Sequence, residues 1–162
     1  MQIPPFTLSR QYQQIGSEIE DEVFRVLKGG QYIGGQEINQ FEEKFSNLIG
    51  VDNTIGCNSG TDALVLALRA LDIGVGDQVI TSSFSFFATA EAISAVGANP
   101  VLVDIDPETY LINTELIEQE INSNTKAIMP VHLFGNAVNM TLIKSLANKY
   151  DLKVIEDCAQ AT

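Results

Sequence analysis

From residue 54 onward, short segments rich in β-branched residues alternate with helical segments, and this alternation constrains the fold most strongly. A strand followed by a helix and a second strand forms a right-handed crossover between parallel strands. The sequence therefore predicts an α/β fold, with a largely parallel sheet and helices on both of its faces. The expected strands are residues 54–58, 78–81, 100–104, 126–131 and 153–157, and the expected helices are residues 61–72, 86–96, 114–121 and 140–150.

The first 50 residues lack this alternation. Apolar residues at helical spacing predict one helix from Ile15 to Leu27, which Gly29 and Gly30 end, and a second helix from Ile38 to Leu48. No strand is expected between these two helices. We therefore expect residues 1–50 to form a helical arm that packs on another surface, such as a second subunit. Residues 51–162 form the predicted strand-containing domain.

Composition and charge narrow the possible partners. A net charge of −12 argues against a nucleic-acid binder, which needs a basic face. No apolar run reaches the roughly 18 residues of a membrane span, and the start of the chain lacks the pattern of a signal peptide. The two cysteines have no zinc-ligand spacing. We expect a cytoplasmic protein that binds neither nucleic acid nor membrane and holds no metal.

The first candidate binding segment is Ser59-Gly60-Thr61, which leads directly into an expected helix. Ligands of α/β proteins bind beyond the carboxyl ends of the strands, and this segment follows an expected strand. Free amides at a helix N-terminus can hold a phosphate. The alternative is an ordinary helix cap, in which Ser59 or Thr61 satisfies the amides of the first turn.

Two further segments follow expected strands. The first contains Phe84, Phe86 and Phe87, one of which can stack on a planar ligand, although most phenylalanines at strand ends pack in the core. The second contains Glu156 and Asp157, and a carboxylate there can keep a heteroaromatic nitrogen protonated. The alternative role of Asp157 is to cap a following helix, and Glu156 is expected to face a backbone group or solvent. A phosphate-binding turn, a flat aromatic ring and a carboxylate match the phosphate, the planar ring and the ring nitrogen of pyridoxal 5′-phosphate (PLP).

Three other residues have two possible roles. His132 is the only histidine and follows an expected strand, where it can act as a base or be held by structural hydrogen bonds. We favour the structural role. Cys57 and Cys158 are interpreted as small packing residues.

Several collinear motifs extend over nearly the whole chain and together resemble one family. They are YIGG (32–35), FEEKF (41–45), NSGTDAL (58–64), GDQVIT (76–81), ATAEAI (88–93), GANPV (97–101), VDID (103–106), PVHLFG (130–135) and IEDCAQA (155–161). The chain resembles the DegT/DnrJ/EryC1/StrS family of PLP-dependent nucleotide-sugar aminotransferases. The resemblance implies the large domain of the aspartate-aminotransferase fold (fold type I).

The resemblance also implies a role for each site residue. Gly60 and Thr61 would donate amides to the cofactor phosphate with Ser59 adjacent, and Phe86 would lie over the pyridine ring. Asp157 would pair with the pyridinium nitrogen and Gln160 would lie near the phenolic oxygen. Tyr32 would line the sugar site.

The chain departs from the family pattern in its lysines. The family's Schiff-base lysine follows the Glu-Asp motif, in a segment beyond Thr162, so we expect no catalytic residue in this chain. We expect the chain to be the N-terminal part of a longer enzyme, with a truncated large domain, and to be inactive alone. Asn139 replaces an aspartate of the family pattern and is expected still to cap the helix at 140–150. The lysines present are Lys28, Lys44, Lys126, Lys144, Lys149 and Lys153.

The full-length enzyme would move an amino group from an amino-acid donor, glutamate, to a nucleotide-linked keto sugar, and would work as a homodimer. Two alternatives stay open. Some relatives carry histidine in place of the lysine and remove a hydroxyl from the sugar, so the enzyme would be a PLP-dependent dehydratase. A non-catalytic module of the same fold is the other alternative.

Overall fold

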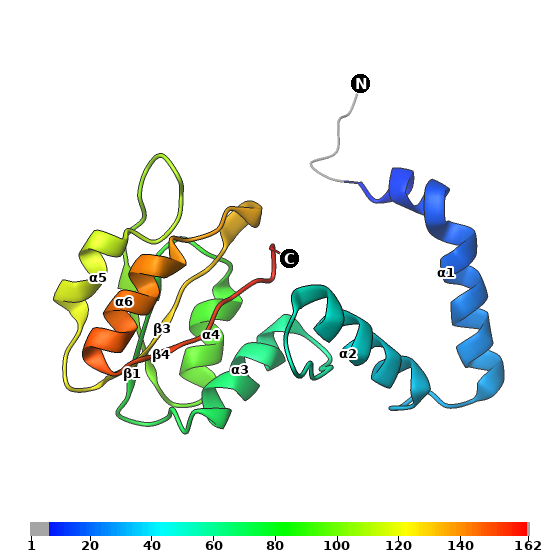
Figure 1. The fold of residues 1–162 in the computed structure, drawn as a ribbon, viewed down its shortest axis with the longest axis horizontal. Coiled ribbons are helices and arrows are strands. Elements are labelled where there is room, and N and C mark those ends of the chain that lie inside the picture. The colour runs from blue at the N-terminus through cyan, green and yellow to red at the C-terminus, as the bar shows by residue number, and fades with distance from the viewer. Residues whose placement is uncertain (1–6, 162) are drawn as a thin grey trace. The chain divides into compact units, whose positions relative to one another are not determined.

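The computed structural model describes residues 7–161, and the chain divides into two compact units after Gly56 (Figure 1). The first unit contains α1 (Ser9–Gly29) and α2 (Gln36–Ile49). Both expected N-terminal helices are therefore present. Each is followed by a glycine, Gly30 or Gly50, with φ of +74° or +76°, a left-handed conformation that glycine adopts at little cost.

Neither helix of the first unit buries an apolar side chain. Within residues 7–56, Gly16 is the one residue that is fully buried. Phe41 and Phe45 stack on each other along α2, with ring centroids 5.5 Å apart. The acidic residues of α1, Glu18, Glu20, Asp21 and Glu22, are exposed. The exposed apolar side chains of α1 are Leu8, Tyr12, Ile15, Ile19, Val23, Phe24 and Leu27, counting Leu8 just before its start.

The second unit contains the strand–helix alternation that the sequence predicts. In chain order its elements are α3 (Gly60–Ala70), β1 (Gln78–Ser82), α4 (Phe87–Ala95), β2 (Asn99–Val103), α5 (Thr114–Glu120), β3 (Thr125–Met129), the 3₁₀ turn η1 (Leu133–Gly135), α6 (Met140–Tyr150) and β4 (Lys153–Val154). The sheet order is β2-β1-β3-β4, and every pair is parallel. Asn139 caps α6 as expected, because its side chain accepts the Leu142 N–H at 3.3 Å.

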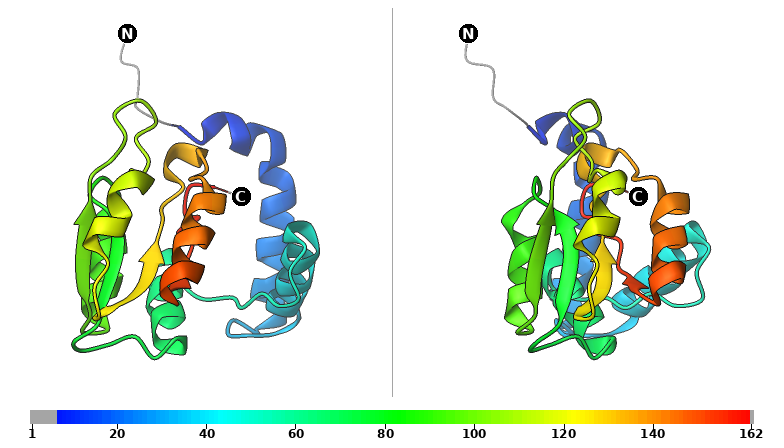
Figure 2. Two further views of the ribbon diagram at one scale, coloured as in Figure 1. Left: turned by 60° about the vertical axis from the view of Figure 1, so that its left-hand side comes forward. Right: turned by 90° about the vertical axis from the view of Figure 1, so that its left-hand side faces the viewer.

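Helices cover both faces of this sheet, as the right-hand view of Figure 2 shows with α4 on one side and α6 on the other. Neighbouring strand residues point to opposite faces, so Val79 joins one core cluster and Ile80 joins the other. The first cluster includes Leu68 of α3 and Ile93 of α4. The second cluster includes Ile143 of α6. Two buried layers of apolar side chains therefore fix the sheet between the helices.

The predicted strand at residues 54–58 is wrong for the described structure. A strand needs a neighbour to complete its ladder of hydrogen bonds, and these five residues pair with no described strand. The Gly56 N–H donates instead to the Glu42 carboxylate at 2.7 Å. The strand expected at 153–157 is also shorter, because ladder pairing covers only Lys153–Val154 and resumes as a single bridge between Val131 and Asp157.

The parallel topology determines which residues share an edge of the sheet. All four strands run in the same direction, so the segments that follow β1, β3 and β4 begin at one edge. Residues 71–77 connect the carboxyl end of α3 to the amino end of β1. The amino end of α3, with Gly60, therefore lies on the side away from the amino end of β1. None of the helices within residues 7–161 has the length and apolar character needed to cross a membrane.

We expect the 162-residue chain to self-associate in solution, because α1 exposes a row of apolar side chains within the first unit. Light scattering should show a mean mass that rises with protein concentration. A double variant, Val23→Gln with Leu27→Gln, should associate less. A monodisperse monomer that unfolds cooperatively would contradict the expectation.

Candidate functional site

Asp157 lies at the carboxyl edge of the sheet, where backbone hydrogen bonds fix it beside the segment after β3. Its N–H donates to the Pro130 carbonyl at 2.9 Å, and its own carbonyl accepts the His132 N–H at 3.1 Å. The residue is only 6% exposed. One carboxylate oxygen accepts the Thr89 hydroxyl at 2.9 Å, and the other accepts the Ala159 N–H at 3.2 Å.

These two donors to the Asp157 carboxylate are both neutral. Among residues 7–161, no lysine, arginine or histidine nitrogen lies within 4.0 Å of this carboxylate. A buried charge without a charged partner is costly. The bond to Ala159 supports a turn at residues 159–160, and the described residues contain no helix after Asp157 for it to cap. The carboxylate still has lone pairs for a further donor, and a cationic N–H would suit them.

Phe86 lies immediately before α4 and its side chain is 76% exposed. Phe84 and Phe87 are exposed as well, so none of the three phenylalanines is buried in the core. Phe86 and Gln160 line one small pocket of about 220 Å³ at this edge of the sheet. The other lining residues are Phe84, Ser85, Leu133 and Phe134.

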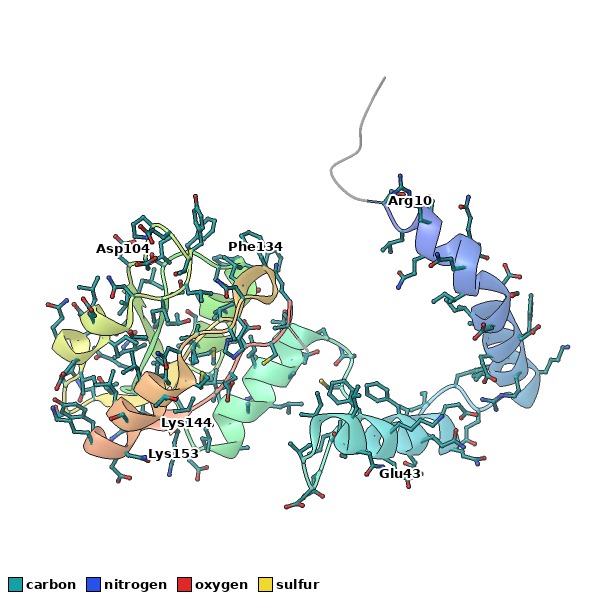
Figure 3. The ribbon with its side chains drawn as sticks, turned by 45° about the horizontal axis from the view of Figure 1, so that its top comes forward. Arg10, Glu43, Asp104, Phe134, Lys144 and Lys153 are labelled. Carbon is teal, nitrogen blue, oxygen red and sulfur yellow. The ribbon has the colours of Figure 1, made fainter. Side chains whose placement is uncertain are left out.

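The Gln160 side chain has a defined orientation in this pocket. Its amide oxygen accepts the Phe134 N–H at 2.6 Å, so the two amide N–H groups remain available as donors. Phe134, labelled in Figure 3 on the η1 turn, has φ of +55° and ψ of +22°. A non-glycine residue in this left-handed conformation costs about 1–3 kcal/mol, and such residues cluster at functional sites.

Ser59 caps α3. Its hydroxyl accepts the Asp62 N–H at 3.1 Å and lies 3.1 Å from the Asp62 carboxylate, to which it donates. The ordinary cap considered from the sequence is therefore present. The cap leaves the N–H groups of Gly60 and Thr61 without a hydrogen-bond acceptor among the described residues. The two interpretations of this segment are compatible, because capping and anion binding use different amides.

His132 is buried and both of its ring nitrogens are hydrogen-bonded. Nδ1 accepts the Val138 N–H at 3.0 Å, so a neutral ring carries its proton on Nε2, which lies 3.0 Å from the Glu156 carboxylate. This arrangement agrees with the structural role. Glu156 is exposed to solvent, as expected, but it also has the imidazole ring as a partner, which the sequence did not predict.

The ligand atoms of His132, Glu156 and Cys158 lie within 4.8 Å of one another, close enough to consider a metal. A metal at Nε2 would take the position of the proton that this nitrogen donates to Glu156. Nδ1 cannot then receive that proton, because it already accepts the Val138 N–H. Hydrogen bonding therefore explains the pairing of His132 with Glu156 without a metal.

The prediction that the cysteines are packing residues is wrong, since Cys57 and Cys158 are both exposed. Cys158 is nevertheless partly desolvated. This desolvation, followed by the negative charges of Glu156 and Asp157, raises the pKa of the Cys158 thiol. Cys158 is therefore poorly suited to act as a nucleophile at neutral pH.

Tyr32 belongs to the first unit, in the loop between α1 and α2. Its hydroxyl donates to the Leu27 carbonyl at 3.0 Å, and its ring is largely exposed. Its predicted place at a sugar site stays a prediction.

Sequence reasoning missed two residues that organise the site. Thr89 joins Asp157 to α4, and its hydroxyl oxygen lies 2.9 Å from that of Ser85, which precedes the helix. No helical spacing indicates this contact, because Ser85 lies outside α4. Phe134 holds the Gln160 amide through its backbone. No local pattern could have indicated the left-handed conformation of Phe134, because non-glycine residues rarely adopt it.

The sequence profile of the DegT/DnrJ/EryC1/StrS aminotransferase family matches residues 13–162. The chain belongs to this family. It is 49% identical over 159 residues to a dTDP-3-amino-3,6-dideoxy-alpha-D-galactopyranose transaminase of Aneurinibacillus thermoaerophilus. The match covers 98% of this chain and 44% of that relative, so the chain spans less than half the length of this relative.

Solved structures of similar proteins show the same fold. NtdA of Bacillus subtilis, crystallised with bound cofactor PMP, superposes with a TM-score of 0.95 at 38% identity, over 99% of this chain and 37% of that one. A GDP-4-keto-6-deoxymannose-3-dehydratase with a trapped PLP-glutamate geminal diamine superposes with a TM-score of 0.82 at 26% identity, over 88% and 39%. The fold assigned from the sequence is confirmed, and it occurs in structures that carry PLP or its amine form.

We expect Cys158 to react more slowly with iodoacetamide in the folded protein than in the urea-unfolded chain, because its raised pKa lowers the fraction of thiolate. A Cys57→Ser background makes Cys158 the only thiol. Mass spectrometry at pH 8 measures the rate. Equal or faster reaction in the folded state would show that Cys158 is activated instead.

Proposed function

We propose that this chain supplies the cofactor-binding residues of a PLP-dependent aminotransferase, which moves an amino group from an amino acid to a nucleotide-linked keto sugar. Glutamate is the donor that we propose. The observation that carries the proposal is the buried Asp157 carboxylate, which has only neutral donors and no cation among the described residues. A protonated ring nitrogen provides the missing opposite charge.

The other residues of the edge fit the same cofactor. The free N–H groups of Gly60 and Thr61, beside Ser59, suit a phosphate at the positive end of α3. The exposed ring of Phe86 offers a face for a pyridine ring. The Gln160 amide oxygen accepts the Phe134 N–H, so the amide N–H groups stay available and suit a phenolate oxygen.

Each of these residues has a separate task in the reaction. When bound, PLP supplies an electron sink for the negative charge that develops on the substrate carbon during amino transfer. Asp157 keeps the ring nitrogen protonated and thereby strengthens that sink. Phe86 and the α3 amides hold the ring and phosphate in one orientation, which lowers the entropic barrier.

The residue that moves the proton at the substrate carbon does not come from this chain in our proposal. Lys126 and Lys153 lie at the amino ends of β3 and β4, opposite the edge that carries Asp157. Lys144 and Lys149 lie on exposed positions of α6, and Lys149 is paired with Glu118 at 2.5 Å. Figure 3 labels Lys144 and Lys153 on the outside of the unit. Lys28 and Lys44 belong to the first unit.

We also propose that the active protein is a cytoplasmic homodimer. The exposed apolar side chains of α1 support an interface, since an apolar surface of this kind is usually covered in the working assembly. A role for Tyr32 at the sugar site is part of the same proposal, because its exposed ring is available to a ligand.

The second candidate function is removal of a sugar hydroxyl by a PLP-dependent dehydratase. The similarity to the GDP-4-keto-6-deoxymannose-3-dehydratase favours keeping it. One position of the full-length protein distinguishes the two enzymes: a lysine there supports the aminotransferase, and a histidine supports the dehydratase. A binding module without activity is disfavoured by the buried Asp157 carboxylate, the exposed Phe86 ring and the free amides of α3, which together suit the cofactor.

In the full-length enzyme, we expect Asp157→Asn to lower kcat by about 10²–10³, because the neutral amide no longer keeps the ring nitrogen protonated. The amide nearly preserves the shape of the side chain, so the cofactor should stay bound, with altered absorbance. Steady-state kinetics and absorbance spectra measure both effects. A kcat within about twofold of wild type would favour the capping role alone.

The 162-residue chain, purified without the longer protein, should show no transamination with any keto sugar. None of the four lysines of the second unit is placed to move a proton at the edge that carries Asp157. Coupled assays for release of 2-oxoglutarate from glutamate measure this activity, with the full-length enzyme as the positive control. Turnover above the background of PLP alone would overturn the assignment of the missing lysine.

A further inference from the structure

Thr89 connects two parts of the candidate site that lie far apart in the sequence. Its hydroxyl oxygen is 2.9 Å from a carboxylate oxygen of Asp157, and its N–H donates to the Phe86 carbonyl at 3.2 Å. Thr89 is only 2% exposed. One buried residue therefore holds both the Asp157 carboxylate and the backbone of Phe86, whose ring is exposed.

The direction of the hydrogen bonds follows from counting protons. A carboxylate only accepts, so the single hydroxyl proton of Thr89 points to Asp157. The Ser85 hydroxyl lies 2.9 Å from the Thr89 hydroxyl oxygen, which has no second proton to give. Ser85 must therefore donate to Thr89, and the protons are ordered from Ser85 through Thr89 to Asp157.

This ordered series of hydrogen bonds starts at the pocket, at Ser85, and ends at the buried Asp157 carboxylate. Ser85 is half-buried and lines the pocket that Phe86 and Gln160 also line. A hydroxyl that already accepts one bond is a stronger donor in the next, because hydrogen bonds in a chain polarise one another. The hydrogen bonds from Ser85 through Thr89 thus stabilise the negative charge of Asp157 and fix the rotation of its carboxylate.

We propose that Thr89 is a positioning residue for the ring nitrogen of the cofactor, with Ser85 setting the direction of its hydroxyl. This inference rests on the proposed function, since it assumes that Asp157 pairs with that nitrogen. Thr89 itself touches neither cofactor nor substrate. Its hydroxyl stabilises the Asp157 carboxylate and orients it towards the ring nitrogen. Its N–H holds the backbone of Phe86 at the start of α4.

The test compares Thr89→Val with Thr89→Ser in the full-length enzyme. Valine keeps the shape of threonine and removes the hydroxyl, whereas serine keeps the hydroxyl. Thr89→Val should lower kcat on the order of tenfold or more, as expected for a lost hydrogen bond to a charged group, with KM nearly unchanged. Thr89→Ser should restore most of the rate.

The second readout is the protonation of the ring nitrogen, which a merely structural role of Thr89 would not move. Enzyme reconstituted with ¹⁵N-labelled PLP should show, for Thr89→Val, a ring-nitrogen chemical shift displaced towards that of neutral pyridine. Thr89→Ser should keep the wild-type shift. Circular dichroism confirms that each variant is folded.

Three outcomes separate the inference from the function on which it rests. A wild-type nitrogen shift and kcat in Thr89→Val, with both changed in Asp157→Asn, would overturn the role of Thr89 alone. A wild-type shift in Asp157→Asn would overturn the proposed function instead. Where Thr89→Val fails to fold, Ser85→Ala replaces it in the test. A smaller displacement of the ring-nitrogen chemical shift in the same direction supports the proposed role of Thr89 and Ser85, and no displacement overturns it.

Discussion

The Asp157 carboxylate is a charge buried at the end of a parallel sheet, and the rest of the site is arranged around it. A buried carboxylate is stable only when hydrogen-bond donors surround it. Here the donors come from the start of α4 and from the turn after Asp157, while the backbone of residues 130–132 fixes its place. The absence of a cation among the described residues distinguishes this carboxylate from an ordinary ion pair. It is the physical reason for assigning a positively charged ring to this edge.

The parallel topology explains why residues so distant in the sequence can meet. Each crossover returns the chain to the same direction, so the loops after β1, β3 and β4 begin at one edge. Two apolar layers hold the strands in this order, one beneath α3 and α4 and the other beneath α5 and α6. Burial of these layers supplies the rigidity that keeps polar groups of the site at hydrogen-bond distance.

The site also contains features that a chain selected for stability alone would avoid. Phe86 exposes most of its ring, and Phe134 holds a left-handed conformation that costs free energy. Gly60 and Thr61 leave amides unused at a helix start that Ser59 caps only in part. Each feature offers a ligand something specific: a flat face, an oriented amide or free N–H donors.

The sequence by itself determined the α/β class, the parallel sheet, the four α-helices α3 to α6 of the second unit and both helices of the first. These follow from local periodicity and from glycines that end helices, so neighbouring residues carry the information. The family was predicted from collinear motifs, and the Asn139 cap from the preference of asparagine for the position before a helix. The predicted strand at 54–58 failed because periodicity indicates an extended segment but does not provide a neighbouring strand to pair with it.

Only the tertiary structure decided which polar atoms meet. Thr89 and Asp157 are 68 residues apart, and the pairing of His132 with Glu156 joins two different strand ends. Exposure was decided there as well, since Phe86 and Cys158 are apolar or weakly polar residues that the sequence places equally well inside or outside. Hydrogen bonds between distant segments depend on sheet order and on angstrom-scale packing. Local sequence patterns carry no record of either.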